Sequence, residues 1–186
     1  MIHYLKADLR KKILEKRDSV SESERKEKSG RIMGRLFADP HFRSASCVAF
    51  YLNIQSEVET KEMIIAAREL GKEVLLPAVV SGQDLELYRF ESFEKLKKGR
   101  FGILEPETED RKPPAHWPEV IIVPGVAFGL CMHRLGYGRG YYDRLLAKIP
   151  SYRIGICFDF QLVEKLPRHE DDQRMNMIIT ERMVIT

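Results

Sequence analysis

Apolar side chains in the first forty residues recur at the spacing of a helix. One set repeats every four residues and predicts a helix over residues 4–17. Ser21, followed three residues later by Glu24, has the spacing of a capping box and predicts a second helix that ends before Asp39-Pro40. The apolar positions of the first helix are Leu5, Leu9 and Ile13, and its neighbouring face carries Lys6, Arg10 and Arg17.

Beyond residue 45 the helical spacing changes to short apolar runs of strand length. Between the first two runs, Thr60 is placed to cap a helix and Gly71 to end it, so this part predicts a right-handed βαβ unit with parallel strands. Alternation over residues 85–89 predicts a further strand, and the Pro-rich, charged residues 105–118 predict a surface connection. The apolar runs cover residues 48–52, 74–76, 120–123, 154–157 and 177–179.

The alternation of strands with helices predicts the fold class. We expect one domain over residues 1–186, an α/β three-layer sandwich in which helices cover both faces of a largely parallel sheet. Sheets of this kind bind ligands at the carboxyl ends of their strands. The loops expected to form a site are those after Leu52, Leu76, Val123 and Phe158.

Composition excludes several classes of protein. Apolar residues make up 44% of the 186 and charged residues 32%, and no apolar run approaches the roughly 20 residues of a membrane span. The N-terminus lacks the features of a secretory signal, so we expect a cytoplasmic protein. Three cysteines without a C-x-x-C pair, and five histidines without ligand spacing, predict neither a disulfide framework nor a transition-metal site.

Positive charge is concentrated at the start of the chain. The net charge is +3, yet residues 1–36 carry 11 Lys and Arg against 6 Asp and Glu. Acidic residues are interleaved and the aromatic pattern of a single-strand binder is absent, which favours a small anionic ligand over nucleic acid. Lys6 and Arg10 lie one helical turn apart and are placed to grip one anion together. A solvated helix face is the alternative interpretation.

Three glycines at every second position follow a predicted strand and precede a predicted helix. This glycine loop (residues 136–140) is typical of phosphate-binding loops, because glycines let backbone N–H groups converge on an anion at a helix N-terminus. Arg134 and Arg139 add planar, charged donors, and Asp143 stands in the first turn of the helix. The spacing matches neither the Walker pattern nor the dinucleotide fingerprint, so the residues alone support a structural turn equally well.

The same segment resembles the signature of a known family. Residues 123–128, VPGVAF, and residues 134–143, RLGYGRGYYD, resemble the 5-formyltetrahydrofolate cyclo-ligases, also called 5,10-methenyltetrahydrofolate synthetases. The resemblance extends over nearly the whole chain. It includes Lys6 and Arg10, residues 55–60, residues 99–103 with Glu105-Pro106, and residues 178–181.

The resemblance implies an ATP-dependent ring closure. In that family 5-formyltetrahydrofolate and MgATP become 5,10-methenyltetrahydrofolate, ADP and phosphate, with Mg²⁺ as cofactor and ATP as cosubstrate. The implied partners are these small molecules, without nucleic acid or membrane, and the implied state is a monomer. Two alternatives remain open: a folate or nucleotide binding module without turnover, and, by fold analogy, a sugar-phosphate isomerase.

The resemblance also implies roles for individual residues. Asp143 and Asp172 resemble the acidic residues of the family's magnesium site. Glu57 resembles the carboxylate on the pterin side, with Tyr51 and Tyr142 lining the folate pocket. The residues implied to bind ATP are Lys6, Arg10, Arg134, Leu135, Gly136, Tyr137, Gly138, Arg139, Gly140, Tyr141 and Asp143. Taken without the resemblance, Glu57 and Tyr51 would be interpreted as structural, since Glu is common near helix starts and Tyr in cores.

Four positions depart from the family pattern. Gly129 and Met132 stand where the family usually carries an Asp and a Gly, and Met adopts positive φ less readily than Gly, so we expect the loop before Arg134 to follow another path. Asp171, beside Asp172, and Asn176 also differ from the family, and the added negative charge is expected to alter the metal site.

Overall fold

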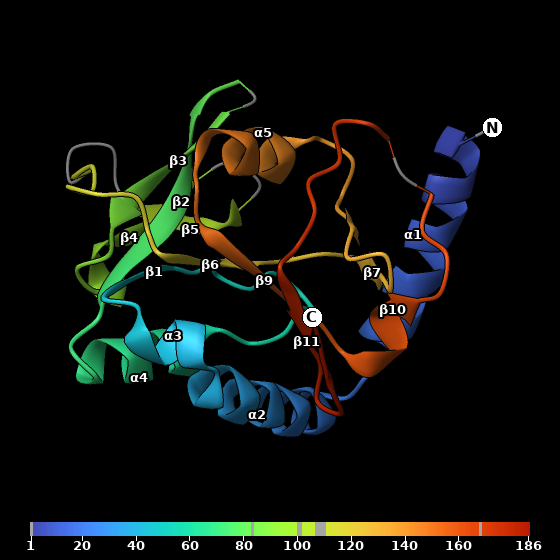
Figure 1. Cartoon of the computed structure of the whole chain (residues 1–186), viewed down its shortest axis with the longest axis horizontal. Helices are drawn as coiled ribbons and strands as arrows, with labels where there is room; N and C mark the ends of the chain where they lie inside the picture. The colour runs from blue at the N-terminus through green and yellow to red at the C-terminus, as the bar shows by residue number, and fades with distance from the viewer. Residues whose placement is uncertain (1, 83, 100–101, 107–110, 168) are drawn as a thin grey trace.

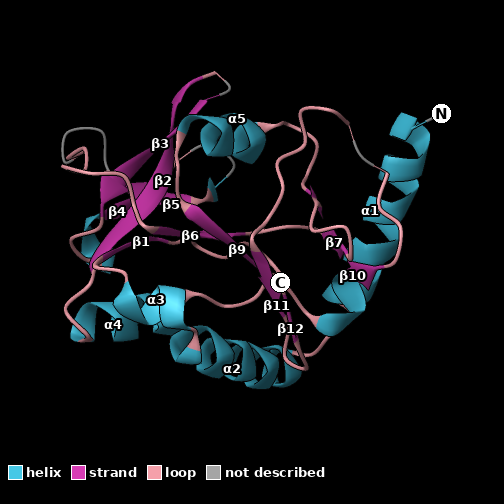
Figure 2. Cartoon of the chain, in the orientation of Figure 1, coloured by secondary structure: helices cyan, strands magenta, loops and turns pink. Residues whose placement is uncertain are grey.

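A seven-stranded sheet runs through the centre of the computed structural model, which describes residues 2–82, 84–99, 102–106, 111–167 and 169–186 (Figures 1 and 2). Neighbouring strands are parallel except at the two edges, where β12 and β3 run antiparallel. The order across the sheet is β12 (Val184–Ile185), β11 (Met177–Ile179), β9 (Tyr152–Ile156), β6 (Val120–Val123), β1 (Cys47–Ala49), β2 (Glu73–Ser81) and β3 (Asp84–Arg89).

Helices cover both faces of this sheet. Helices α2 (Glu22–Ala38), α3 (Pro40–Ser44) and α4 (Lys61–Glu69) pack on one face, and α5 (Tyr141–Lys148) packs on the other (Figure 1). Helix α1 (Ile2–Asp18) lies at the side of the molecule, next to a small sheet. That sheet has the order β10 (Leu162–Val163), β7 (Ala127–Gly129) and β8 (Arg134–Leu135). A separate pair of antiparallel strands consists of β4 (Leu96–Lys98) and β5 (Leu104–Pro106). The described residues also form two 3₁₀ turns, η1 (Phe93–Lys95) and η4 (Asp159–Gln161).

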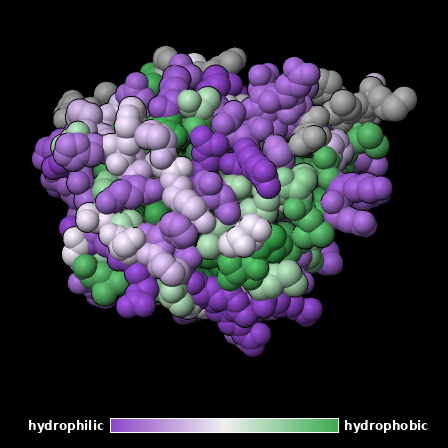
Figure 3. All heavy atoms as spheres, viewed as in Figure 1, coloured by the Kyte–Doolittle hydropathy of each residue, from purple (hydrophilic) through white to green (hydrophobic). Residues whose placement is uncertain are grey.

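The two layers of core explain why the central strands are apolar without interruption. In β6, Val120 and Ile122 pack with α2, α3 and α4, whereas Ile121 and Val123 pack with α5. All four side chains are at most 1% exposed, because both faces of the strand are covered. The outer surface of α2, in contrast, is hydrophilic (bottom of Figure 3). The α/β three-layer sandwich predicted from the sequence is thus confirmed.

Most of the predicted elements are confirmed, with local corrections. Ser21 caps α2 by accepting a hydrogen bond from the Glu24 N–H, and β1, α4 and β2 form the parallel βαβ unit. Strand β1 is shorter than predicted and ends at Ala49. Thr60 precedes α4 without capping it, because its hydroxyl donates to the Tyr51 carbonyl at 2.6 Å instead.

Three further expectations have different outcomes. The expectation of another loop path before Arg134 assumed that Met132 would avoid positive φ. Met132 has φ 67°, so that assumption was wrong. Its side chain is 4% exposed in the core beneath α5, and this burial offsets the cost of the left-handed backbone. The predicted surface connection overlaps β5, and residues 100–101 and 107–110 lie outside the described residues. Among the described helices, none is long and apolar enough to cross a membrane.

Gly155 in β9 is expected to tolerate no larger residue. A Cβ atom at this position would lie 2.4 Å from Cε1 of Phe128, which is fully buried. We therefore expect Gly155→Ala to lower the free energy of unfolding by about 1–3 kcal/mol, measured by urea denaturation. Gly34→Ala is the matched control: it lies in α2, where an added Cβ would meet no atom within 4 Å, and it should raise stability by about 0.5–1 kcal/mol. Equal stability of both variants would contradict this packing.

Candidate active site

A cavity of about 1000 Å³ lies at the carboxyl ends of β1 and β6, between the glycine loop, α1 and α5. The segments directly after β1 and β6 line it, as predicted, and so do Leu76, Pro77 and Val79 of β2. The segment directly after Phe158 was also predicted to contribute, but the described lining residues come from further along that connection, at His169 and residues 171–173.

The glycine loop connects β8 to α5 in the conformation that glycine favours. Gly138 has φ 98°, and Gly140, the residue before α5, has φ 68°. Gly138 also lies close to Arg10 of α1, since a Cβ there would come within 3.3 Å of the Arg10 guanidinium. The Arg10 Nε donates to the Gly136 carbonyl at 2.7 Å. Helix α1 is therefore docked directly onto the loop.

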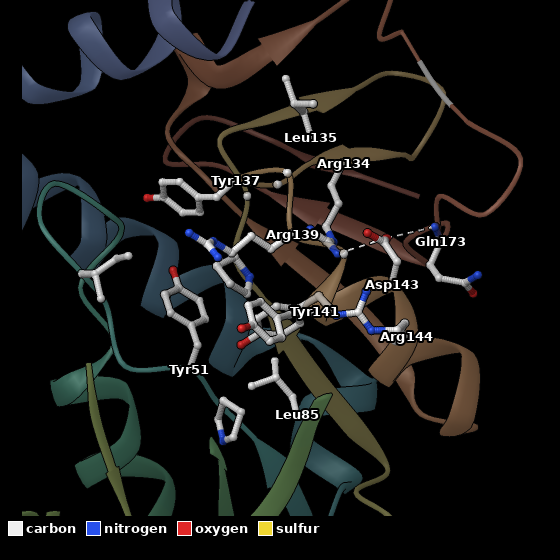
Figure 4. A pocket seen from close by; sticks show the side chains of 18 of the residues that line it. Tyr51, Leu85, Arg134, Leu135, Tyr137, Arg139, Tyr141, Asp143, Arg144 and Gln173 are labelled. Atoms are coloured by element: carbon white, nitrogen blue, oxygen red, sulfur yellow. Dashed lines mark hydrogen bonds and ion pairs between the residues drawn. The ribbon is translucent and has the colours of Figure 1, made fainter. Parts of the chain in front are cut away.

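Arg134 is buried beside the first turn of α5 (Figure 4). Its Nη2 donates to Asp143 Oδ1 at 3.0 Å, and the backbone N–H of Gln173 donates to the same oxygen at 3.3 Å. Burial lowers the pKa of Arg134, and the Asp143 carboxylate opposes that change. The Arg134 Nε has no hydrogen-bond partner among the described residues, so this guanidinium retains a donor.

Lys6 and Asp172 connect α1 to the segment that follows η4. The Lys6 Nζ lies 2.6 Å from Asp172 Oδ2, and the backbone N–H of His169 donates to the same oxygen at 2.7 Å. Burial raises the pKa of Asp172, but the hydrogen bonds from Lys6 and His169 outweigh it and the pKa is lowered overall. Asp172 is thus held as a carboxylate. Its neighbour Asp171 is exposed and lies 3.5 Å from the His169 ring.

Glu57 is a buried carboxylate that lines the cavity where the connection between β1 and α4 meets Tyr137 of the glycine loop. It is 4% exposed, and it accepts hydrogen bonds from the Ile54 N–H and the Tyr137 hydroxyl, both at 3.1 Å. Burial raises its pKa and outweighs the lowering effects of the Ile54 hydrogen bond, the charge of Arg17 and the Tyr137 hydrogen bond, so the pKa is raised overall. Tyr51 is also buried, and its hydroxyl donates to the Val58 carbonyl.

All residues that the sequence predicted for the site line this one cavity. They are Lys6, Arg10, Tyr51, Glu57, Arg134, Leu135, Gly136, Tyr137, Gly138, Arg139, Gly140, Tyr141, Tyr142, Asp143 and Asp172. Their individual roles stay predictions. Asn176 is not among the lining residues, and its side chain accepts from the Arg153 N–H instead.

Sequence reasoning missed Arg17. It placed Arg17 on a charged helix face, whereas this residue is buried and contacts Ser56, Tyr137 and Glu57. A charged residue followed by Asp18 and Ser19 at the end of a basic helix carries no signal of burial. The burial arises from segments that lie 39 and 120 residues away in the chain.

The carboxylates fit a magnesium ion that is held mainly by other ligands. No cluster of three or more His, Cys, Asp or Glu side chains suited to a metal occurs in the part of the chain that the structure describes. Mg²⁺ commonly keeps several waters and binds one or two carboxylates together with substrate phosphates. Asp143 and Asp172 meet that requirement, since both line the cavity that the glycine loop faces.

Comparisons with known proteins agree on one family. Residues 3–181 match the 5-formyltetrahydrofolate cyclo-ligase family. The chain is 34% identical over 163 residues to a probable 5-formyltetrahydrofolate cyclo-ligase of Schizosaccharomyces pombe, covering 78% of this chain and 80% of that protein. It is 31% identical over 178 residues to the 5-formyltetrahydrofolate cyclo-ligase of Escherichia coli K12, covering 92% and 98%.

A solved structure gives the same result for the fold. The 5,10-methenyltetrahydrofolate synthetase of Aquifex aeolicus superposes with a TM-score of 0.85 at 38% identity, covering 97% of this chain and 92% of that one. The synthetase of Mycoplasma pneumoniae superposes with a TM-score of 0.73 at 25% identity, covering 95% and 98%.

Asp143 is expected to stabilise the ligand-free protein through Arg134. Asp143→Asn removes the charge that compensates a guanidinium whose side chain is 4% exposed, so the free energy of unfolding should fall by about 2 kcal/mol in urea denaturation. Asp8→Asn is the control, because Asp8 pairs with Lys12 while both side chains are 75% exposed, and its loss should cost less than about 0.5 kcal/mol. If both variants lose the same small amount, Asp143 does not compensate Arg134.

Proposed function

Because the chain belongs to the 5-formyltetrahydrofolate cyclo-ligase family, we propose that it catalyses the closure of 5-formyltetrahydrofolate to 5,10-methenyltetrahydrofolate with consumption of MgATP. The observation that carries this proposal is the shared cavity. One space of about 1000 Å³ is lined both by the glycine loop with its cations and by the buried Glu57. Two ligands that react with each other need such a common site.

The chemistry requires an activated formyl oxygen. This oxygen attacks the γ-phosphorus of ATP, and the bond to ADP breaks. N10 of the folate then attacks the formyl carbon and loses its proton, and the carbon–oxygen bond breaks with release of phosphate. Phosphate leaves far more readily than hydroxide, which is why ATP is consumed. The protein has mainly to position the two substrates and to neutralise the charge that develops.

The residues around the glycine loop suit the phosphate half of this reaction. Backbone N–H groups at the start of α5 favour anions, and the planar guanidinium groups of Arg134 and Arg139 match phosphate oxygens. Lys6 and Arg10 approach the same loop from α1. When bound, Mg²⁺ would supply positive charge to the phosphates, and Asp143 and Asp172 would hold it.

Glu57 suits the folate half. Its Oε1 and Oε2 accept from Tyr137 and Ile54, and a carboxylate retains further lone pairs for ligand N–H groups. Tyr51 and Tyr142 add aromatic surface to the same cavity. A flat ring with N–H donors fits this combination of a carboxylate with aromatic walls.

Turnover provides the direct test of the function. Purified protein mixed with 5-formyltetrahydrofolate, Mg²⁺ and ATP should form the methenyl product, followed by its near-ultraviolet absorption, and an ATP-free sample should form none. Folate and ATP binding without product or ADP would instead identify a binding module. Turnover of a sugar phosphate without ATP would contradict the ligase assignment.

Arg139 is expected to act on ATP. Arg139→Ala removes charged hydrogen bonds to phosphate, so the KM for ATP should rise by about tenfold or more while the KM for the folate changes little. Steady-state kinetics with each substrate varied in turn measures both constants. Arg31→Ala is the control, because Arg31 is an exposed arginine of α2 that pairs with Glu27. An unchanged KM for ATP in the Arg139 variant would refute its phosphate role.

A further inference from the structure

Arg17 forms a fully buried junction between three separate segments. It lies in the last turn of α1, and its side chain is 1% exposed. The Nε donates to Ser56 Oγ at 3.0 Å in the connection between β1 and α4, and Nη2 donates to the Tyr137 hydroxyl in the glycine loop at 2.7 Å. Ser56 in turn donates to Asp18.

The third nitrogen of this guanidinium faces Glu57. Nη1 lies 4.0 Å from Glu57 Oε1 and has no hydrogen-bond partner among the described residues. The Tyr137 hydroxyl lies between the two charges, because it accepts from Arg17 and donates to the same Oε1. Arg17 therefore acts on Glu57 directly through its charge and indirectly through Tyr137.

The other groups that face Glu57 are neutral or negative. Burial, and then the charge of Glu57, raises the pKa of both Tyr51 and Tyr142, so both stay protonated at neutral pH. For Tyr137, burial and then Glu57 raise the pKa to about 12, so its hydroxyl keeps its proton and donates it. Asp18, which accepts from the Ser56 hydroxyl, is the other acidic residue of the junction. Arg17 is the cation whose charge lowers the pKa of the Glu57 carboxyl, and it lies 4.0 Å from Glu57 Oε1.

We propose that Arg17 is a positioning residue for the reaction: it keeps Glu57 ionised and, through Tyr137, holds the carboxylate in a set direction toward the folate. This inference rests on the proposed function, because it assigns the ligand of Glu57 to the folate. Arg17 is not among the residues that line the cavity, so it is expected to act on the folate only through Glu57 and Tyr137.

A purely structural role explains the arrangement less well. A buried ion pair is no more stable than apolar side chains of similar volume, because the desolvation of the charges offsets their attraction. If the end of α1 had only a packing role, an apolar side chain at position 17 would stabilise it as well as the buried arginine does. The same helix carries Lys6 and Arg10, which line the cavity, and Arg10 contacts the glycine loop. The position of α1 therefore affects both the expected phosphate site and Glu57.

The first measurement is a titration of Glu57 in the ligand-free protein. Carboxyl carbon resonances are followed by NMR from about pH 5 to about pH 9, with the Glu57 signal identified by its loss in Glu57→Gln. Arg17→Met should shift the Glu57 midpoint upward by about 1–3 pH units, and Tyr137→Phe should shift it upward by less. Arg17→Lys, which keeps the charge, should restore most of the wild-type midpoint.

Arg25→Met is the matched control. Arg25 is a partly buried helical arginine that pairs with Glu59 at 3.4 Å, two residues from Glu57. It should leave the Glu57 midpoint and the folate affinity unchanged.

The second measurement is the dissociation constant of 5-formyltetrahydrofolate over the same pH range. Its pH dependence should move with the Glu57 midpoint in Arg17→Met and Tyr137→Phe. An unmoved Glu57 midpoint in these variants overturns the proposal, and Tyr137→Phe alone decides if Arg17→Met does not fold. A moved midpoint with an unmoved affinity profile overturns it as well. Absence of folate binding in the wild type rejects the proposed function instead, and the NMR titration still shows whether Arg17 controls Glu57.

Discussion

Positive side chains of α1 find their partners more than 100 residues further along the chain, and the cavity depends on these contacts. Lys6 pairs with Asp172, Arg10 donates to Gly136, and Arg17 donates to Tyr137. Few apolar residues of α1 take part in the core, with Ile13 buried and Leu9 and Leu14 partly buried against it. Polar contacts to the glycine loop and to the acidic segment therefore decide where this helix lies, and the helix forms one wall of the cavity.

This attachment has a consequence for ligand binding. Oxygen atoms of the protein are the partners of three cations of the cavity. Asp172 pairs with Lys6, Asp143 pairs with Arg134, and the Gly136 carbonyl accepts from Arg10. Phosphate oxygens are acceptors of the same kind, so under the proposed function ATP would replace these acceptors and the cations would keep hydrogen-bond partners. The carboxylates released in that exchange are the two that suit Mg²⁺.

Local patterns in the sequence predicted local structure well. The apolar spacing predicted α1, the capping-box spacing predicted α2, and the buried runs predicted the central strands, because these patterns report local helix starts and the faces that a segment must bury. The extent of β1, the use of the Thr60 hydroxyl and the left-handed Met132 depend on neighbours in space, so the sequence pattern was misleading there. The resemblance to a family selected residues that all line one cavity in the structure. It gave no information on Arg17, because the burial of this residue depends on two segments that are distant in the chain.

Under the proposed function, one cavity holds both substrates, with the ATP phosphates at the glycine loop and the folate at Glu57. A crystal structure of the chain with 5-formyltetrahydrofolate and a non-hydrolysable ATP analogue tests it most directly. We expect the terminal phosphate on the N–H groups of residues 136–140 and near Arg134, with the folate ring against Glu57 and its formyl oxygen directed at that phosphate. Phosphates bound away from the glycine loop, or a folate that does not contact Glu57, would contradict it.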